Sequence, residues 1–383
     1  MQNLKSNRVN YKFIASFSFF LSLFIVISIL IRTNFFDAET LKPTDQVISV
    51  STATTDSSKN SIKIGVYIKN IYMLSTHDKT FNAEGFIWLT WPQKAEDFFL
   101  AQKLTPNKWL NFANQIDNGN FKFEQFYENS IKLKDGQYYQ LFKFSGQFYI
   151  SDIPFHKYPF ETLKIPLIFE LNNLSKIDAG NQTHDFHLVP DQASSGVGNN
   201  IDLIGYKTTA FNVLSKLHVY GSNFGSEVPN TKPISTDQAV FQTTYKNSIN
   251  SAIITLFLPL TITMALVLTS PILSSSAWEI RLSIPPTALL TLVFLQINYR
   301  ENLPVISYIT FMDLIYNFCY LIIFMLFGLF LWGSNKVNLA SEAEKTLVIE
   351  KIDLIDKRIL LVTLLIAPVW ILMNWISISH NHP

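Results

Sequence analysis

Long apolar runs occur near the N-terminus and throughout the C-terminal third of the chain. Five of them approach the ~20 residues that a helix needs to cross the hydrocarbon core of a bilayer. They cover residues 13–31, 249–269, 280–299, 305–332 and 359–379. The pattern predicts a membrane protein with an α-helical transmembrane domain of four helices over residues 248–383. It also predicts one additional N-terminal transmembrane helix or signal anchor within residues 1–32.

Basic residues near these runs predict the topology. Lys5, Arg8 and Lys12 precede the first run, and no clear small-x-small cleavage site follows it, which favours an uncleaved signal anchor. The polar loop predicted at residues 333–358 is also rich in lysine and arginine. Basic loops stay in the cytoplasm. Both segments therefore predict the N-terminus inside, residues 33–248 outside and the C-terminus outside.

The residues between the spans show strand patterns. Apolar and polar residues alternate from Ile62 to Lys69, the period of a half-buried strand. Further strands are predicted at residues 86–91, 131–133, 138–150, 164–171, 208–220 and 239–246, with a hairpin turn at Asp135-Gly136. Many short strands without long amphipathic helices predict an antiparallel β-sandwich over residues 61–247. Residues 33–60, polar and without a period, predict a flexible spacer.

Composition narrows the functional classes. The 383 residues are 48% apolar and 15% charged, as expected of a chain with membrane spans, and the net charge of +1 argues against nucleic-acid binding. Cys319 is the single cysteine, which excludes an intrachain disulfide. We find no nucleophile elbow, CxxC pair or phosphate loop, so we predict neither an enzyme nor a cofactor. His184 and His187, three residues apart, are too weak a pattern to predict a metal site.

Several motifs carry a resemblance to a known family. The stretch from Phe155 to Glu161, FHKYPFE, resembles the loop that names the Cys-loop receptors, in its bacterial form without the disulfide and with Glu161 where Asp is commoner. The stretches 71–72, 86–91, 256–259, 300–304 and 308–313 resemble, in the expected order, two strands, the first pore-domain helix, the outer turn and the third helix. Over residues 62–379 the chain resembles the bacterial branch of the pentameric ligand-gated ion channels.

This resemblance implies the function and its partners. It implies a homopentamer in the bacterial inner (plasma) membrane, with a ligand-binding β-sandwich on the periplasmic or extracellular side. A small molecule or protons would act as the agonist, and inorganic cations would be conducted. The residues implied for coupling the two domains are Tyr158, Pro159, Phe160, Glu161, Lys246, Arg300 and Pro304. Lys246 is nearly as well explained as a residue that reaches the membrane surface.

The ligand site implied by the resemblance lies between subunits and is walled by aromatic residues. The candidates are Trp88, Trp109, Phe112, Phe186, Tyr220 and Phe224, with residues 223–236 as a capping loop. Trp88 is better explained as a core residue of its strand. A non-conducting, membrane-anchored solute sensor of the same fold is the alternative function, which the extra N-terminal helix and a double proline in the second C-terminal span favour.

The second of the four C-terminal spans predicts a pore-lining helix from its own residues. Seven positions at steps of three or four share one helical face: Glu279, Ser283, Thr287, Leu290, Phe294, Ile297 and Glu301. Carboxylates stand at both ends of this stripe, with hydroxyls and then bulky apolar groups between them. A ring of Glu279 would concentrate cations, and rings of Leu290 and Phe294 would form a constriction that closes by dewetting. The residues alone slightly favour packing between helices instead, whereas the resemblance favours a pore.

Three features of this region leave alternatives open. Pro285-Pro286 predicts either a kink at the inner end of the helix or a late start of the regular helix. Arg281 lies two residues from Glu279, where the family also has a basic residue that points away from the pore. Asp313 is either functional, as an acid inside the membrane, or a hydrogen-bonding residue at the start of its helix.

Overall fold

The computed structural model describes residues 46–50, 60–151, 153–171, 186–222, 235–306 and 308–381. The chain forms two compact units, which we call the β unit (Thr40–Ile153 and Thr162–Asn247) and the helical unit (which includes Pro154–Glu161 and Ser248–Pro383). The loop with the family motif therefore belongs to the helical unit. The predicted N-terminal span lies outside the described residues, and so does most of the predicted spacer.

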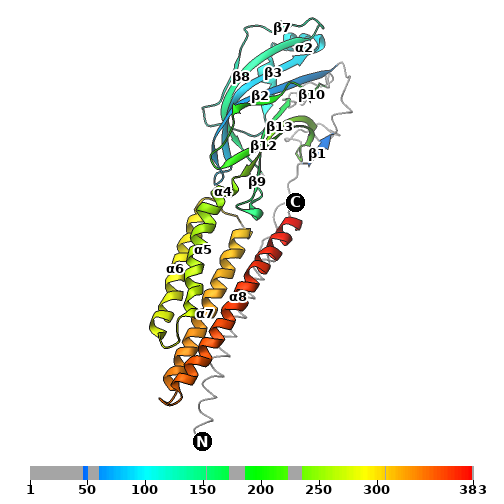
Figure 1. The fold of residues 1–383 in the computed structure, drawn as a ribbon. Coiled ribbons are helices and arrows are strands. Elements are labelled where there is room, and N and C mark those ends of the chain that lie inside the picture. Colours follow the sequence, from blue (N-terminus) through cyan, green and yellow to red (C-terminus); the bar gives the residue numbers. More distant parts are fainter. Residues whose placement is uncertain are drawn as a thin grey trace. The chain divides into compact units, whose positions relative to one another are not determined.

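The β unit contains two sheets (Figure 1). One has five strands in the order β1 (Gln46–Val50), β12 (Tyr206–Val219), β13 (Ser235–Asn247), β9 (Thr162–Leu171) and β4 (Leu110–Phe112). The other has eight: β10 (His187–Pro190), β2 (Ser61–Ser75), β3 (Thr80–Trp91), β8 (Tyr138–Tyr149) and β5 (Gln115–Ile116), with β11 (Gly196–Asn200) on β2 and β6 (Lys122–Gln125) and β7 (Ile131–Lys132) on β8. Pairing is antiparallel except where β10 and β11 join β2.

The core of the β unit contains residues that alternate with exposed or half-buried ones along the strands. Every second residue of β3 is buried, because successive side chains of a strand point to opposite faces. Phe112 on β4 meets Phe144 and Phe148 on β8 of the other sheet, with ring centroids 6.0 Å apart in both pairs. These aromatic contacts join the two sheets.

Some predicted boundaries in the β unit are wrong. Within the predicted spacer, β1 pairs with β12 through Gln46↔Val219 to Val50↔Ser215. The side chains of Val47 and Ile48 are about half exposed. Burial therefore does not require apolar and polar residues to alternate along this strand, and its sequence shows no such alternation. Helices α2 (Gln93–Ala101) and α3 (Pro106–Trp109) and strands β10 and β11 were not predicted. The predicted turn is present, with Gly136 at a φ of 84°.

Four helices of the helical unit are long and apolar enough to cross a membrane, among the described residues. The first, Ile249–Ile272, is built from α4 (Ile249–Ala252), the wider π turn η4 (Ile253–Phe257), α5 (Leu258–Thr269) and η5 (Ser270–Ile272). The π turn ends two residues before Pro259, whose ring carries no N–H to complete the regular hydrogen-bond ladder.

The other three spans are α6 (Trp278–Glu301), α7 (Phe311–Leu339) and α8 (Lys345–Asn381). Helix α6 runs without interruption through Pro285 and Pro286, so the regular helix does not begin late. The loop predicted at residues 333–358 is wrong, because only residues 340–344 separate α7 from α8. Hydropathy identifies only the apolar part of a helix. The Lys, Glu and Leu residues next to that part also favour helix, so the helix extends beyond it.

Helix α7 is the centre of the helical unit. It packs against α6 on one side and α8 on the other, while α5 packs on α6 (Figure 1). Half of the most apolar stretch of α7 is buried, against 11% of that of α8. Gly333 of α7 allows close approach of α8, since a Cβ there would come within 3.2 Å of Ile352 Cγ2. Helix α8 consequently turns most of its apolar surface outwards.

Candidate functional site

One face of α6 is exposed along its whole length and carries polar groups. All seven residues predicted to share a face are exposed: Glu279, Ser283, Thr287, Leu290, Phe294, Ile297 and Glu301. Leu290 and Phe294 are exposed by 58% and 61%. The buried residues of α6 lie on its other side: Arg281, Pro285, Ala288, Leu292 and Tyr299. The stripe therefore has no partner within the described part of the helical unit.

The hydroxyls on this stripe are hydrogen-bonded within α6. Ser283 Oγ donates to the carbonyl of Ile280 at 2.8 Å, and Thr287 Oγ1 donates to the carbonyl of Ser283 at 2.9 Å. Such bonds to the preceding turn satisfy the donor inside the helix, while both residues remain exposed. These two residues do not pack against another helix of the described chain.

The outer surface of α8 shows what a purely apolar exposed face looks like in this protein. Leu361, Leu365 and Leu372 are each about 60% exposed or more. The exposed face of α6 differs because it combines carboxylates, hydroxyls and apolar groups. A carboxylate or hydroxyl is costly against lipid chains. Two chemically distinct exposed surfaces, on α6 and on α8, therefore exist in one unit.

At the N-terminal end of α6, Arg281 points away from this stripe, as the resemblance implies. Its side chain is 3% exposed and forms an ion pair with Asp356 of α8. Its guanidinium also lies 4.3 Å from the ring centroid of Phe330 on α7. The opposite directions of Glu279 and Arg281 follow from their spacing of two residues, which turns a helix by about 200°.

At the C-terminal end of α6, Asp313 joins α6 to α7. It accepts hydrogen bonds from Arg300 Nε at 3.1 Å and Arg300 Nη2 at 2.5 Å, and also from the Tyr299 hydroxyl. Asp313 Oδ2 also accepts from the Thr310 backbone N–H at 2.9 Å, while the Thr310 hydroxyl accepts from the Asp313 N–H. This reciprocal pair is a capping box. The hydrogen-bonding role at the helix start is thus the one that the structure displays.

The loop from Pro154 to Glu161 rests on the ends of the helices within the same unit. The Phe155 backbone N–H donates to the Tyr308 hydroxyl at 3.2 Å, and His156 stacks on Tyr308 with centroids 3.8 Å apart. Tyr158 stacks on Tyr299 of α6 at 6.0 Å. Burial, with a smaller contribution from the nearby Glu161 carboxylate, raises the pKa of Tyr158 to about 12. Tyr158 is therefore neutral at physiological pH.

Phe160 anchors the other side of the loop. Its ring lies 5.8 Å from Phe257 in the first span and 5.4 Å from Trp375 near the end of α8. The remaining residues predicted to couple the domains fall into two groups. Pro159, Glu161 and Pro304 are buried in the helical unit, while Lys246 is an exposed residue of β13 in the β unit. Of the predicted coupling set, Tyr158, Phe160 and Arg300 make side-chain contacts with the helices.

The aromatic residues predicted to bind a ligand are mostly core residues of the β unit. Trp109, Phe112 and Phe186 are exposed by only 6%, 5% and 3%. The Trp109 and Phe186 rings pack edge to face at 5.4 Å. These three rings fill the interior and do not form an open aromatic wall in this chain. Phe224 and residues 223–234 of the predicted capping loop lie outside the described residues.

Trp88 is held in place by the strand beside it. Its ring covers Gly65, where a Cβ would lie 2.1 Å from the indole. The indole N–H donates to Asp191 Oδ2 at 3.3 Å, and Lys63 Nζ lies 3.2 Å from the other carboxylate oxygen. Burial opposes ionisation of Asp191, but hydrogen bonds from Lys63, Ser194 and Trp88 outweigh it and hold its pKa below the ordinary value. These contacts give Trp88 a structural role in the β unit.

Tyr220 belongs to a polar cluster that the sequence did not reveal. Its hydroxyl donates at 2.7 Å to Glu170, a carboxylate exposed by only 4%. Asn111 Nδ2 donates to the same oxygen at 3.1 Å, and Gln238 Nε2 donates to the other at 3.3 Å. His218 Nδ1 lies 3.7 Å from Glu170. A buried carboxylate thus sits beside an imidazole and a phenol.

Sequence periodicity carried no signal for this cluster. In β9 the odd-numbered residues from Leu163 to Phe169 point inwards, which assigns Glu170 to the outer, polar face. Its burial comes from side chains of β12, β13 and the residue after β12, which are brought beside it by strand pairing. The described residues contain no group of three or more His, Cys, Asp or Glu side chains that could hold a metal ion. His187 instead pairs with Asp237 at 2.8 Å, and His184 lies outside the described residues.

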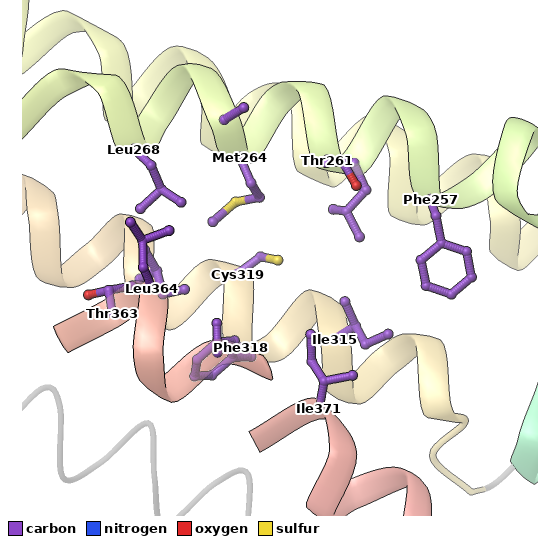
Figure 2. Close-up of a pocket in the computed structure, with 14 residues that line it drawn as sticks. Phe257, Thr261, Met264, Leu268, Ile315, Phe318, Cys319, Thr363, Leu364 and Ile371 are labelled. Atoms are coloured by element: carbon purple, nitrogen blue, oxygen red, sulfur yellow. The ribbon is translucent and has the colours of Figure 1, made fainter. Parts of the chain in front are cut away.

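An apolar cavity of about 290 Å³ lies between the first span, α7 and α8 (Figure 2). Phe257, Met264 and Leu268 line it from the first span, Cys319 from α7 and Leu364 from α8. The Cys319 side chain is 6% exposed, so its thiol is shielded from solvent. The cavity therefore lies among the helices and offers mainly hydrocarbon contacts.

No protein-family model matches this chain, and a search of curated proteins also found no match. The resemblance to the channel family therefore rests on the sequence motifs alone.

Proposed function

We propose that this chain is one subunit of a homopentameric ligand-gated ion channel that conducts inorganic cations. A small ligand or protons would open it by acting on a β-sandwich formed by the two sheets. That domain would lie on the periplasmic or extracellular side of a bacterial inner membrane. The observation that carries the proposal is the polar stripe on the exposed face of α6.

The physical argument concerns what can cover this stripe. Lipid chains offer no hydrogen bonds to Glu279 or to the Ser283 and Thr287 hydroxyls, so a face of this kind is costly in a monomer. A ring of identical subunits puts each stripe on a common axis, where water and ions satisfy it. Leu290 and Phe294 would then form the narrow apolar segment that closes the pore by dewetting. The purely apolar surface of α8 suits the lipid side.

The polar cluster around Glu170 is the best-supported place for the agonist to act. It offers a carboxylate, an imidazole and a phenol to a cationic or hydrogen-bonding ligand, and Tyr220 was independently predicted to line the ligand site. A second step would carry the signal to the pore. The loop from Tyr158 to Phe160 contacts the first span, α6 and α8 within the helical unit, so displacement of this loop would act on the pore helix directly.

Current recordings from purified protein in a planar bilayer test the proposal. We expect currents that depend on pH or on added amines or divalent ions. Thr287→Cys should make the current sensitive to a charged, water-soluble thiol reagent, because Thr287 is exposed. The neighbouring Ala288→Cys is the matched control, since Ala288 is 8% exposed and should not react. The native Cys319 is shielded, so the wild-type protein treated with the same reagent gives the background reaction.

The outcomes separate the two candidate functions. Block of Thr287→Cys with no effect on Ala288→Cys supports a pore lined by this face. Absence of current under every condition, with a bound solute detected on the β unit, would support the non-conducting sensor instead. Because α6 runs unbroken through Pro285 and Pro286, the double proline no longer favours that sensor.

A further inference from the structure

Asp356 is a buried acid on the helix that is otherwise the most exposed. Its side chain is 1% exposed, although α8 turns mostly apolar surface outwards. Asp356 Oδ2 binds Arg281 Nη2 of α6. The Asp356 carboxylate of α8 thus points inwards to Arg281, the residue two positions after Glu279.

The surroundings of Arg281 contain a second, weaker acid contact. Asp353 Oδ1 lies 3.9 Å from Arg281 Nη1, and it also accepts from the Ser275 backbone N–H at 2.8 Å. The Phe330 ring of α7 closes the third side at 4.3 Å. Arg281 is therefore enclosed between an aromatic ring and two carboxylates, and Asp356 is its direct partner.

We propose that Asp356 is a positioning residue for charge selectivity: it holds and neutralises Arg281, so that Glu279 alone sets the sign of the inner mouth. This inference rests on the proposed channel function and deepens it. Without Asp356, each subunit would place a guanidinium opposed only by the more distant Asp353 one helix width, about 10 Å, behind its Glu279. In a poorly screened protein interior, charges act over that distance.

The inference predicts opposite effects from the two halves of the ion pair. Asp356→Asn exposes the positive charge of Arg281 and should weaken the preference for cations. Arg281→Gln removes that charge and should leave the preference intact or strengthen it. A merely structural ion pair would give the same effect from either substitution, because both break the same contact.

Reversal potentials in a NaCl gradient measure this difference. We expect Asp356→Asn to lower the sodium-to-chloride permeability ratio by about threefold or more. Asp356→Glu should restore the ratio, and the double variant Arg281→Gln with Asp356→Asn should return to the wild-type value. Glu350→Gln is the matched control, because it removes the same charge from an exposed position of the same helix.

Each outcome decides the inference. An unchanged ratio in Asp356→Asn, or an equal shift in Arg281→Gln, overturns it while leaving a conducting wild type and the proposed function in place. If the wild type carries no current, the proposed function fails, and the inference fails with it. Should Asp356→Asn not assemble, Asp353→Asn replaces it, since Asn still accepts from Ser275. A smaller shift in the same direction is then required, and no shift overturns the inference.

Discussion

Tyr158 stacks on Tyr299, with ring centroids 6.0 Å apart and ring planes at 21°. Tyr299 in turn stacks on Tyr316 of α7 at 5.3 Å, so three rings from the loop, α6 and α7 follow one another. Tyr299 is fully buried. This arrangement joins the loop from Pro154 to Glu161 to the C-terminal end of α6, the proposed pore helix.

Removing the first ring of this stack should destabilise the helical unit and weaken gating. Tyr158→Ala is expected to lower the free energy of unfolding by roughly 2 kcal/mol, from lost burial and lost ring contact. Tyr158→Phe keeps the stacked ring and is the control. Thermal unfolding in detergent gives the first effect, and agonist dose-response curves give the second. Equal curves for Tyr158→Ala and the wild type would show that the stack does not transmit the signal.

The purified protein should form a closed ring, expected to be a pentamer. The exposed polar stripe of α6 has no partner in the described part of one chain, and a symmetric assembly supplies one. Native mass measurement in mild detergent gives the number of subunits. Only monomers or dimers, across several detergents, would contradict the prediction.

Leu290 should act as a gate. Its side chain is 58% exposed in the single chain, and five copies around an axis would form an apolar constriction. Leu290→Thr should wet this constriction and increase the open fraction, seen as added leak current or activation at lower agonist concentration. Leu365→Thr on α8 is the matched control, with 66% exposure on the outer surface. Identical behaviour of both variants would argue that Leu290 does not line the pore.

Glu279 should dominate selectivity over Glu301. In the proposed pore, a ring of Glu279 would lie at the narrow inner mouth, whereas Glu301 would lie at the wider outer end, where salt screens charges over about 8 Å. Glu279→Gln should lower single-channel conductance and cation preference, and Glu301→Gln should change them less. Arg281→Gln should leave the preference nearly intact, because Arg281 is buried away from the stripe. A strong shift for Arg281→Gln without one for Glu279→Gln would mean that the assigned facing of α6 is wrong.

Asp191 should make the stability of the β unit depend on acid pH. Its pKa is lower in the folded state than in the unfolded chain, so its stabilising effect is present above its unfolded pKa, near 4, and is lost as pH falls further. Asp191→Asn should lower the free energy of unfolding by roughly 1 kcal/mol at pH 7, and this difference should shrink towards pH 3. Unfolding midpoints over that range test it, with the exposed Glu124→Gln as control. A difference independent of pH would exclude the charge of Asp191 as the cause.

The local pattern of apolar and polar residues was sufficient to predict the long strands and helices. The alternation from Ile62 to Lys69 falls within β2, and the runs around Phe86 and Tyr138 fall within β3 and β8. The four C-terminal apolar runs correspond to the four long helices. Elements with little buried surface were not predictable in this way. Strand β1 exposes Val47 and Ile48, and the polar start of α8 continues beyond the apolar stretch that marked it.

The sequence by itself determined which residues of α6 share a face, because helical spacing alone places Glu279, Thr287 and Leu290 on one side. Only the tertiary structure decided what lies on the other side. Arg281 meets Asp356 across 75 residues of sequence, and Glu170 meets Tyr220 across 50. Periodicity is a property of neighbouring residues, whereas these contacts depend on helix packing and strand register, which side chains from the whole unit fix together.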